Sequence, residues 1–151
     1  MKARSDEIID YTKKIVEEFK EMYKSSGYDL NKALAEVYVT YSPLNIGGEI
    51  DVLYVIDYEK KICRVQDHKI KDKVLDELST RNALTKELEK KKASEIDIIR
   101  IQLSFYAFCL AKVGWTVEGG DVFGRNGEWK HYEVELIPTD EMEELLVKYL
   151  K

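Results

Sequence analysis

The sequence of 151 residues predicts one domain, spanning 1–151, of mixed α/β (α+β) class with a central mixed β-sheet flanked by helices. Two observations support this fold class. Segments with helical spacing alternate along the chain with pairs of Val- and Ile-rich runs typical of strands. The chain also contains 44% hydrophobic residues and lacks an internal repeat or low-complexity linker, which favours one compact core.

Helical spacing of apolar residues marks two long segments. Asp6–Lys24 is amphipathic, with Ser5 available as an N-cap and Gly27 as a stop. Ser94–Val113 is apolar around most of its circumference, which predicts a mostly buried helix that ends at Gly114. The other expected helices are a short piece at Asn31–Ala35, one or two short helices in Lys71–Lys92 and a final amphipathic helix from Thr139 to Leu150.

Runs rich in β-branched and aromatic residues predict the strands. Polar Tyr58–Lys61 joins two such runs into a first hairpin, and the glycine-containing turn Gly124–Glu128 joins two others into a second hairpin. The expected strands are Val37–Tyr41, Glu49–Asp57, Ile62–Ile70, Trp115–Phe123 and Trp129–Ile137.

Composition limits the classes of function. A net charge of −5 argues against a protein that coats nucleic acid by bulk electrostatics, although a few well-placed cations can still grip phosphates. Cys63 and Cys109 each stand alone in an apolar run, which indicates buried thiols rather than a disulfide or metal motif. Without an apolar run of about 20 residues, the chain is expected to be soluble, cytoplasmic and independent of membranes.

The first hairpin concentrates the candidate chemistry. If it turns about Glu59, Asp51 lies directly opposite Asp67, and cross-strand neighbours on one face have Cβ atoms about 5 Å apart. Side chains alternate along a strand, so Lys69 shares the face of Asp67 and Glu49 shares the face of Asp51. Two opposed carboxylates repel each other unless they share a divalent cation.

We therefore expect Mg²⁺ or Mn²⁺ to be held by Asp51, Asp67 and the backbone carbonyl of His68, with Lys69 orienting or deprotonating a water molecule. The competing interpretation is a solvated hairpin face with ordinary surface ion pairs. Val- and Ile-rich sequence on both sides of the carboxylates instead favours a central, covered hairpin. The nearby pattern Glu59–Lys61 falls at the turn and cannot face Asp51 across the ladder.

Four stretches, in this order, resemble the RecB-type branch of the PD-(D/E)XK nuclease superfamily, and in particular small phage or prophage nucleases. The resemblance implies a restriction-endonuclease-like core and a metal-dependent deoxyribonuclease. The sequence departs from the family pattern at two positions. His68 stands in the middle of the lysine motif, where an aromatic residue is usual, and Ile70 stands where a threonine often follows the lysine. The stretches are Glu36, Ile46–Asp51, Val65–Lys69 and Gln102–Ala107.

The resemblance also implies roles for residues outside the hairpin. Glu36 matches an upstream acid that supports the metal, although an ordinary surface glutamate fits the same position. Gln102 and Tyr106 lie four apart on one helix face and would reach the substrate, although a tyrosine at this spacing is more often part of a core. A buried Gln102 amide would need partners. Lys71 is a further candidate phosphate contact.

The implied activity is cleavage of DNA, as an exonuclease or structure-selective enzyme of recombination, repair or phage DNA processing. A different class of function stays open, namely a catalytically silent subunit of the same fold that binds a protein partner or nucleic acid ends. A homo-oligomer and an accidental motif match are also open. Arg125 and Lys130, near the second hairpin, and the lone His131 are interpreted as solvated surface residues.

Overall fold

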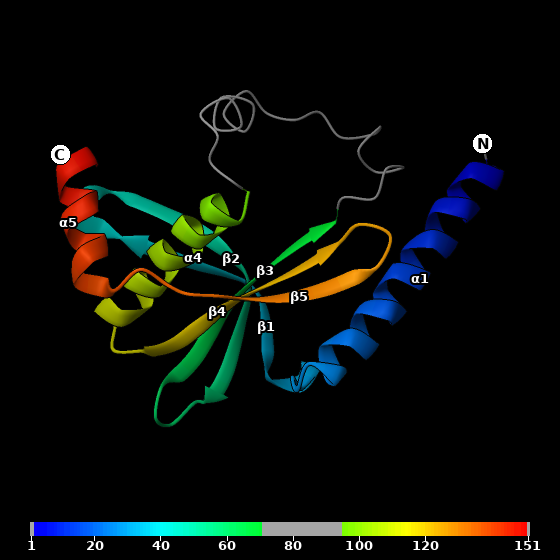
Figure 1. Cartoon of the computed structure of the whole chain (residues 1–151), viewed down its shortest axis with the longest axis horizontal. Coiled ribbons are helices and arrows are strands. Elements are labelled where there is room, and N and C mark those ends of the chain that lie inside the picture. Colours follow the sequence, from blue (N-terminus) through cyan, green and yellow to red (C-terminus); the bar gives the residue numbers. More distant parts are fainter. Residues whose placement is uncertain (1, 71–94, 151) are drawn as a thin grey trace.

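The computed structural model describes residues 2–70 and 95–150. It contains a five-stranded mixed sheet flanked by helices, as the sequence predicts (Figure 1). In chain order the elements are α1 (Lys2–Ser25), the 3-10 helix η1 (Leu30–Lys32), β1 (Ala33–Tyr41), the 3-10 helix η2 (Ser42–Leu44), β2 (Ile46–Asp57), β3 (Ile62–Ile70), α4 (Glu95–Lys112), β4 (Thr116–Arg125), β5 (Trp129–Val134) and α5 (Thr139–Leu150).

The strands lie side by side in chain order, from β1 at one edge to β5 at the other. Three neighbouring pairs are antiparallel, whereas β3 and β4 are parallel. A parallel pair needs a crossover connection, and α4 belongs to it. α4 packs on β3 and β4 and also reaches β1 and β2, while α5 packs on α4. In Figure 1 these two helices lie on one side of the fanned strands and α1 lies on the other.

Each side of the sheet has its own core. On the α4 side, Val65 and Leu103 are at most 1% exposed and belong to a large aliphatic cluster. The α1 side is aromatic, with Tyr23 and Phe123 at its centre and Phe19 packed against them. Strand alternation assigns successive residues to these two cores. Gln66 and Asp67 in β3 and Asp121 in β4 are therefore buried although they are polar.

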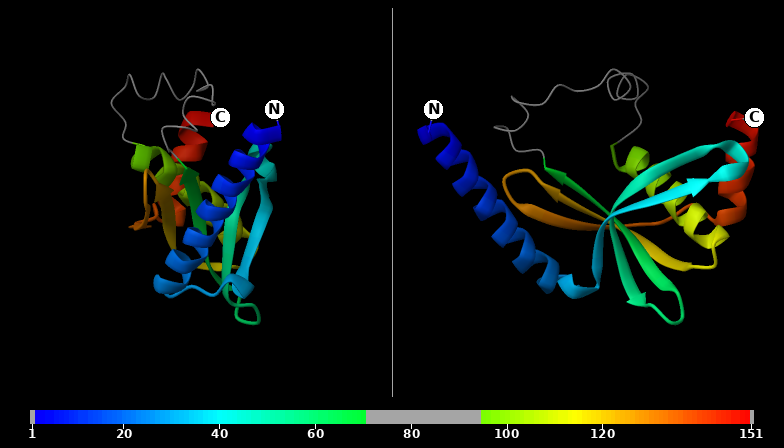
Figure 2. Two further views of the ribbon diagram at one scale, coloured as in Figure 1. Left: turned by 90° about the vertical axis from the view of Figure 1, so that its right-hand side faces the viewer. Right: turned by 180° about the vertical axis from the view of Figure 1, so that it is seen from behind.

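Helix ends are set by glycines where the sequence predicts them. Gly27 follows α1 with φ of 94° and Gly114 follows α4 with φ of 95°, a left-handed conformation that glycine adopts most readily. α1 begins at Lys2 rather than Asp6, so Ser5 lies inside the helix and is not its cap. Figure 2 shows that the N-terminal part of α1 extends away from the strands. Among the described helices, none has the length and apolar character needed to cross a membrane.

Several other boundaries differ from expectation, and β2 begins at Ile46 rather than at Glu49. The predicted helix at Asn31–Ala35 is the 3-10 helix η1 only as far as Lys32, because from Ala33 onward the backbone pairs with β2. β4 continues past Phe123 through the start of the turn. β5 ends at Val134 rather than at Ile137. The backbone N–H of Ile137 donates to Ser104 Oγ of α4 at 2.9 Å instead of pairing with β4. The expected helices in Lys71–Lys92 lie outside the described residues.

Candidate functional site

The hairpin of β2 and β3 has the register that places Asp51 opposite Asp67. Val52 lies opposite Gln66, and the ladder keeps this register through Val55. The two aspartates occupy the next position, and Asp51 is one of the groups that raise the pKa of Asp67. Asp51 Oδ2 also accepts a hydrogen bond of 3.1 Å from the backbone N–H of His68. The structure therefore brings the two aspartates together, and Asp51 ties itself to the strand that carries Asp67.

Asp67 is a buried acid with few polar partners. Its residue is 3% exposed, and no described residue donates a hydrogen bond to its Oδ2 atom. Lys69 Nζ lies 3.5 Å from that oxygen. Burial, and next the interaction with Asp51, raises the pKa of the Asp67 carboxyl to about 7, against the opposing effect of Lys69. The ionised pair is thus costly in isolation and would be relieved by a proton or a cation.

A bend in the β1–β2 hairpin lies at this site. Glu36 and Asp51 are left out of the ladder between paired positions on either side, and Glu36 has a left-handed φ of 56°. Beyond the bend, Gly48 and Ile50 pack toward α4. Glu49, expected beside Asp51, is consequently exposed on the other face, because the bend reverses which alternate residues face α4.

The structure does not bring the Glu36 carboxylate into the acidic pair. Its side chain is exposed, although its backbone lies in register with Asp51. Within residues 2–70 and 95–150, no group of three or more His, Cys, Asp or Glu side chains is placed to hold a metal ion. Two of the three expected acids converge, and Glu36 stays outside.

Gln102 and Tyr106 approach the acids from α4. The Gln102 side-chain amide donates to Tyr106 Oη at 2.8 Å, so the two side chains share one face as their spacing predicts. Gln102 is exposed rather than buried. The Tyr106 ring lies against Gly48, where an added Cβ would come within 2.7 Å of the ring. Burial is the main cause that raises the pKa of Tyr106, and the charges of Asp51 and Asp67 add to it.

His68 faces the other way, as strand alternation predicts. Its ring packs against Phe19, with centroids 4.7 Å apart, and against Phe123. Burial lowers the pKa of His68, and its buried Nε2 has no hydrogen-bond partner among the described residues. This side chain is therefore a packing residue of the aromatic core, and only its backbone reaches the acidic pair.

A buried polar network on the α1 side was not anticipated. Asp121 in β4 is fully buried and accepts hydrogen bonds from Arg64, Gln66 and Tyr28 at 2.8 to 3.2 Å. His131 Nε2 lies 2.7 Å from it, so this histidine is not the surface residue expected. Burial alone would raise the pKa of Asp121, but hydrogen bonds from Arg64, His131 and Tyr28 outweigh it and hold the pKa below its ordinary value. The position of Asp121 within an apolar run of the sequence was the signal that could have predicted its burial.

The remaining expectations concern residues away from this cluster. Cys63 and Cys109 are buried free thiols, as predicted, and burial raises the pKa of both. Lys71 lies outside the described residues. No protein-family model matches the chain, and no curated protein matches it in sequence.

Proposed function

We propose that this chain is a divalent-metal-dependent nuclease with a restriction-endonuclease-like core that hydrolyses DNA phosphodiester bonds. One observation carries the proposal: a buried Asp67 carboxylate, with an oxygen left unbonded by the described residues, faces a second carboxylate and adjoins Lys69. A buried carboxylate that faces a second, exposed carboxylate is destabilising unless a bound proton or cation offsets its charge. The mixed sheet flanked by helices agrees with the proposed core.

The residues present fit Mg²⁺ or Mn²⁺, which prefer oxygen ligands. Asp51 and Asp67 would hold the cation, together with the backbone carbonyl of His68, and Glu36 is proposed to support it from the neighbouring strand. Asp67 Oδ2 accepts no hydrogen bond from the described residues and has only the Lys69 ammonium beside it, at 3.5 Å, so it is the oxygen most suited to bind a metal ion. A bound cation would supply Lewis acidity toward a phosphodiester oxygen and make water more acidic.

Lys69 is proposed to act on the attacking water. Its side chain is 40% exposed, so the ammonium group is accessible while it remains beside Asp67. In hydrolysis the water oxygen bonds to phosphorus, the bond to one sugar oxygen breaks, and that oxygen takes up a proton. Lys69 would orient the water and stabilise negative charge that develops on the phosphate. Gln102 and Tyr106 are proposed to contact the substrate strand.

The test is a cleavage assay with single- and double-stranded DNA and with RNA, in Mg²⁺ and in Mn²⁺. We expect metal-dependent cleavage of DNA by the wild type and its loss in Asp67→Ala. Glu59→Gln, an exposed acid at the turn of the same hairpin, is the matched control and should cleave normally. The products would also separate exonuclease from structure-selective cleavage, the two activities proposed for recombination, repair or phage DNA processing in the cytoplasm. Failure with every substrate and both metals would overturn the proposal.

A second candidate function follows from the two-acid site. Because no third acidic or histidine side chain joins the pair among the described residues, a catalytically silent subunit that binds a protein partner or nucleic acid ends is the competing proposal. Calorimetry with Mn²⁺ distinguishes the two. Heat of binding that disappears in Asp67→Ala favours the nuclease, whereas an absence of Mn²⁺ binding by the wild type favours the silent subunit.

A further inference from the structure

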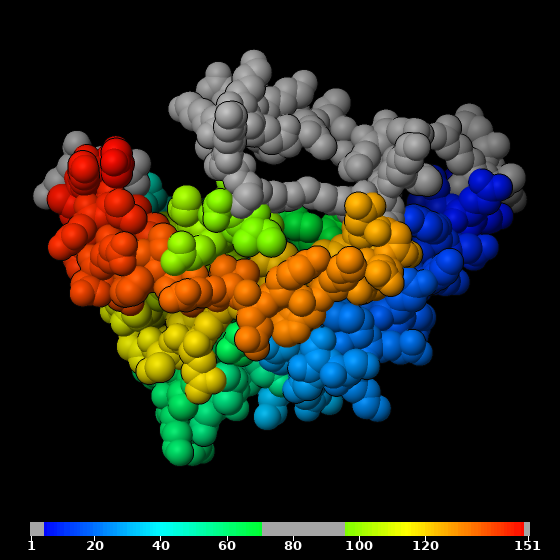
Figure 3. Space-filling model, viewed as in Figure 1, coloured from blue at the N-terminus to red at the C-terminus, as the bar shows by residue number. Residues whose placement is uncertain are grey.

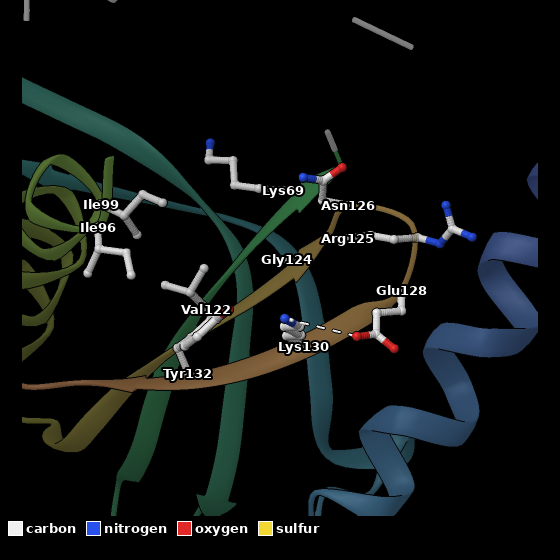
Figure 4. A pocket seen from close by; sticks show the side chains of 10 residues that line it. All are labelled: Lys69, Ile96, Ile99, Val122, Gly124, Arg125, Asn126, Glu128, Lys130 and Tyr132. Atoms are coloured by element: carbon white, nitrogen blue, oxygen red, sulfur yellow. Dashed lines mark ion pairs between the residues drawn. The ribbon is translucent and has the colours of Figure 1, made fainter. Parts of the chain in front are cut away.

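A pocket of about 300 Å³ opens between the start of α4 and the hairpin of β4 and β5 (Figure 4). Ile96 and Ile99 of α4 form one wall, and Val122 lies at the base. Lys69 and Tyr132 also line the pocket. The volume is at the lower end of the range for small-molecule sites, which suits one small group such as a single nucleobase.

The pocket lies on the face of the sheet that carries the acidic pair. Asp67 is beside Val122 in β4, and Val122 is opposite Tyr132 in β5. Lys69 is likewise beside Gly124, which is opposite Lys130. Because adjacent strands lie about 4.8 Å apart, Tyr132 is about 10 Å from Asp67 across the sheet. A chain bound at the acids can therefore place its next unit in the pocket.

The lining combines an aromatic ring with the exposed ammonium groups of two lysines. Tyr132 is 42% exposed and stands on β5, the edge strand that crosses the surface in Figure 3. Lys130 is an exposed cation whose Nζ is 4.0 Å from Glu128 Oε1, a long surface contact that competes weakly with a phosphate. Gly124 keeps the floor open, since a Cβ there would meet nothing within 4 Å. Arg125 also lines the pocket, but it is buried rather than solvated as expected, and its guanidinium points to α1 and bonds Glu18.

We infer that this pocket binds one unstacked base of a single-stranded nucleic acid, with Tyr132 stacking on the base and Lys130 contacting the adjoining phosphate. Aromatic side chains stack on bases whose faces are free, and a duplex hides those faces. The inference rests on the proposed function in taking the acidic pair as the place where the strand is cut. It adds the substrate class: single strands, or duplex ends with an unpaired terminus.

The test is fluorescence anisotropy of a labelled oligothymidylate in EDTA, where the absence of divalent ions prevents cleavage. Loss of one stacked base predicts roughly 5- to 150-fold weaker binding by Tyr132→Ala. Tyr132→Phe keeps the ring and should bind as the wild type does. Tyr149→Ala, on α5 and 70% exposed, is the matched control and should change nothing. Gly124→Val, which fills the floor, should weaken binding.

Salt dependence tests the role of Lys130. Loss of one phosphate contact with a single strand lowers the slope of log K against log salt by about 0.7, and this is the change expected for Lys130→Gln. A matched duplex should bind more weakly than the single strand, and an oligouridylate of equal length shows whether RNA is also accepted. The inference is overturned if the wild type binds neither single strand, if the duplex binds more tightly, or if Tyr132→Ala binds as the wild type does.

Cleavage kinetics with Mn²⁺ separate this inference from the proposed function. Cleavage with a KM unaffected by Tyr132→Ala would support the nuclease activity and show that the pocket does not bind the substrate. Single-strand binding that Tyr132→Ala abolishes, without cleavage under any condition, would support the binding pocket and refute the nuclease activity. A raised KM with little change in kcat is the result expected if both are correct.

Discussion

Replacing Asp67 with asparagine should stabilise the metal-free protein while destroying its metal site. The ordinary pKa of 3.8 and the raised value of about 7 differ by roughly 3, and one pKa unit corresponds to about 1.4 kcal/mol, so ionisation of Asp67 costs the folded state about 4 kcal/mol. Because the folded-state pKa is the higher one, this cost is absent below pH 3.8, grows as the pH rises toward 7 and is complete above 7. Asparagine does not titrate and carries no charge toward Asp51.

Urea unfolding in EDTA at pH 8 should therefore show Asp67→Asn to be about 2 to 4 kcal/mol more stable than the wild type, with the difference shrinking to about 1 to 2 kcal/mol at pH 5. Mn²⁺ should narrow this difference in the free energy of unfolding. Ligand at 100 times its dissociation constant adds about 2.7 kcal/mol, and only the wild type should gain it. Glu59→Gln is the control at an exposed acid. The reasoning is refuted if Asp67→Asn is no more stable than the wild type at pH 8, or if both gain equally from Mn²⁺.

Three further predictions concern the residues around the site. Gly48→Ala should destabilise the fold by about 1 to 3 kcal/mol and reduce cleavage, because its Cβ would come within 2.7 Å of the Tyr106 ring; thermal unfolding beside a cleavage assay measures both effects. Asp121→Ala should cost about 3 to 5 kcal/mol at pH 7 by leaving the part-buried Arg64 guanidinium without its carboxylate partner, and since the Asp121 pKa is lowered, the wild type should lose this stability only as the pH falls below about 4. His68→Phe should raise stability by about 1 kcal/mol in urea and leave Mn²⁺ binding intact, because it removes a buried unbonded nitrogen while keeping the ring contacts; lower stability would contradict this.

The parts of the structure that follow from local sequence patterns were predictable. Alternation and a polar turn were enough to give the register of β2 and β3, and hence the opposition of Asp51 and Asp67. Glycines with left-handed backbones were enough to end α1 and α4. These features depend on residues near one another in the chain, so periodicity and turn chemistry determine them.

The features that the sequence did not predict depend on tertiary contacts. The bend at Glu36 and Asp51 leaves no local signature, and it moves Glu49 away from the site. Residues from Ala33 join a strand because β2 offers a partner, which propensity alone does not reveal. Asp121 is satisfied by groups from β3, β5 and the segment after α1, so its burial could be suspected from its apolar neighbours but its partners could not be named.

The measurement that tests the central claim most directly is cleavage of end-labelled single-stranded DNA with Mn²⁺ by the wild type, Lys69→Ala and Lys60→Ala. Lys60 is an exposed lysine at the turn of the same hairpin and serves as the matched control. We predict cleavage by the wild type and by Lys60→Ala, with a loss of at least about 100-fold in Lys69→Ala, the usual size of a lost proton-transfer or charge-stabilising group. Equal cleavage by all three proteins, or none by any of them, would contradict the account.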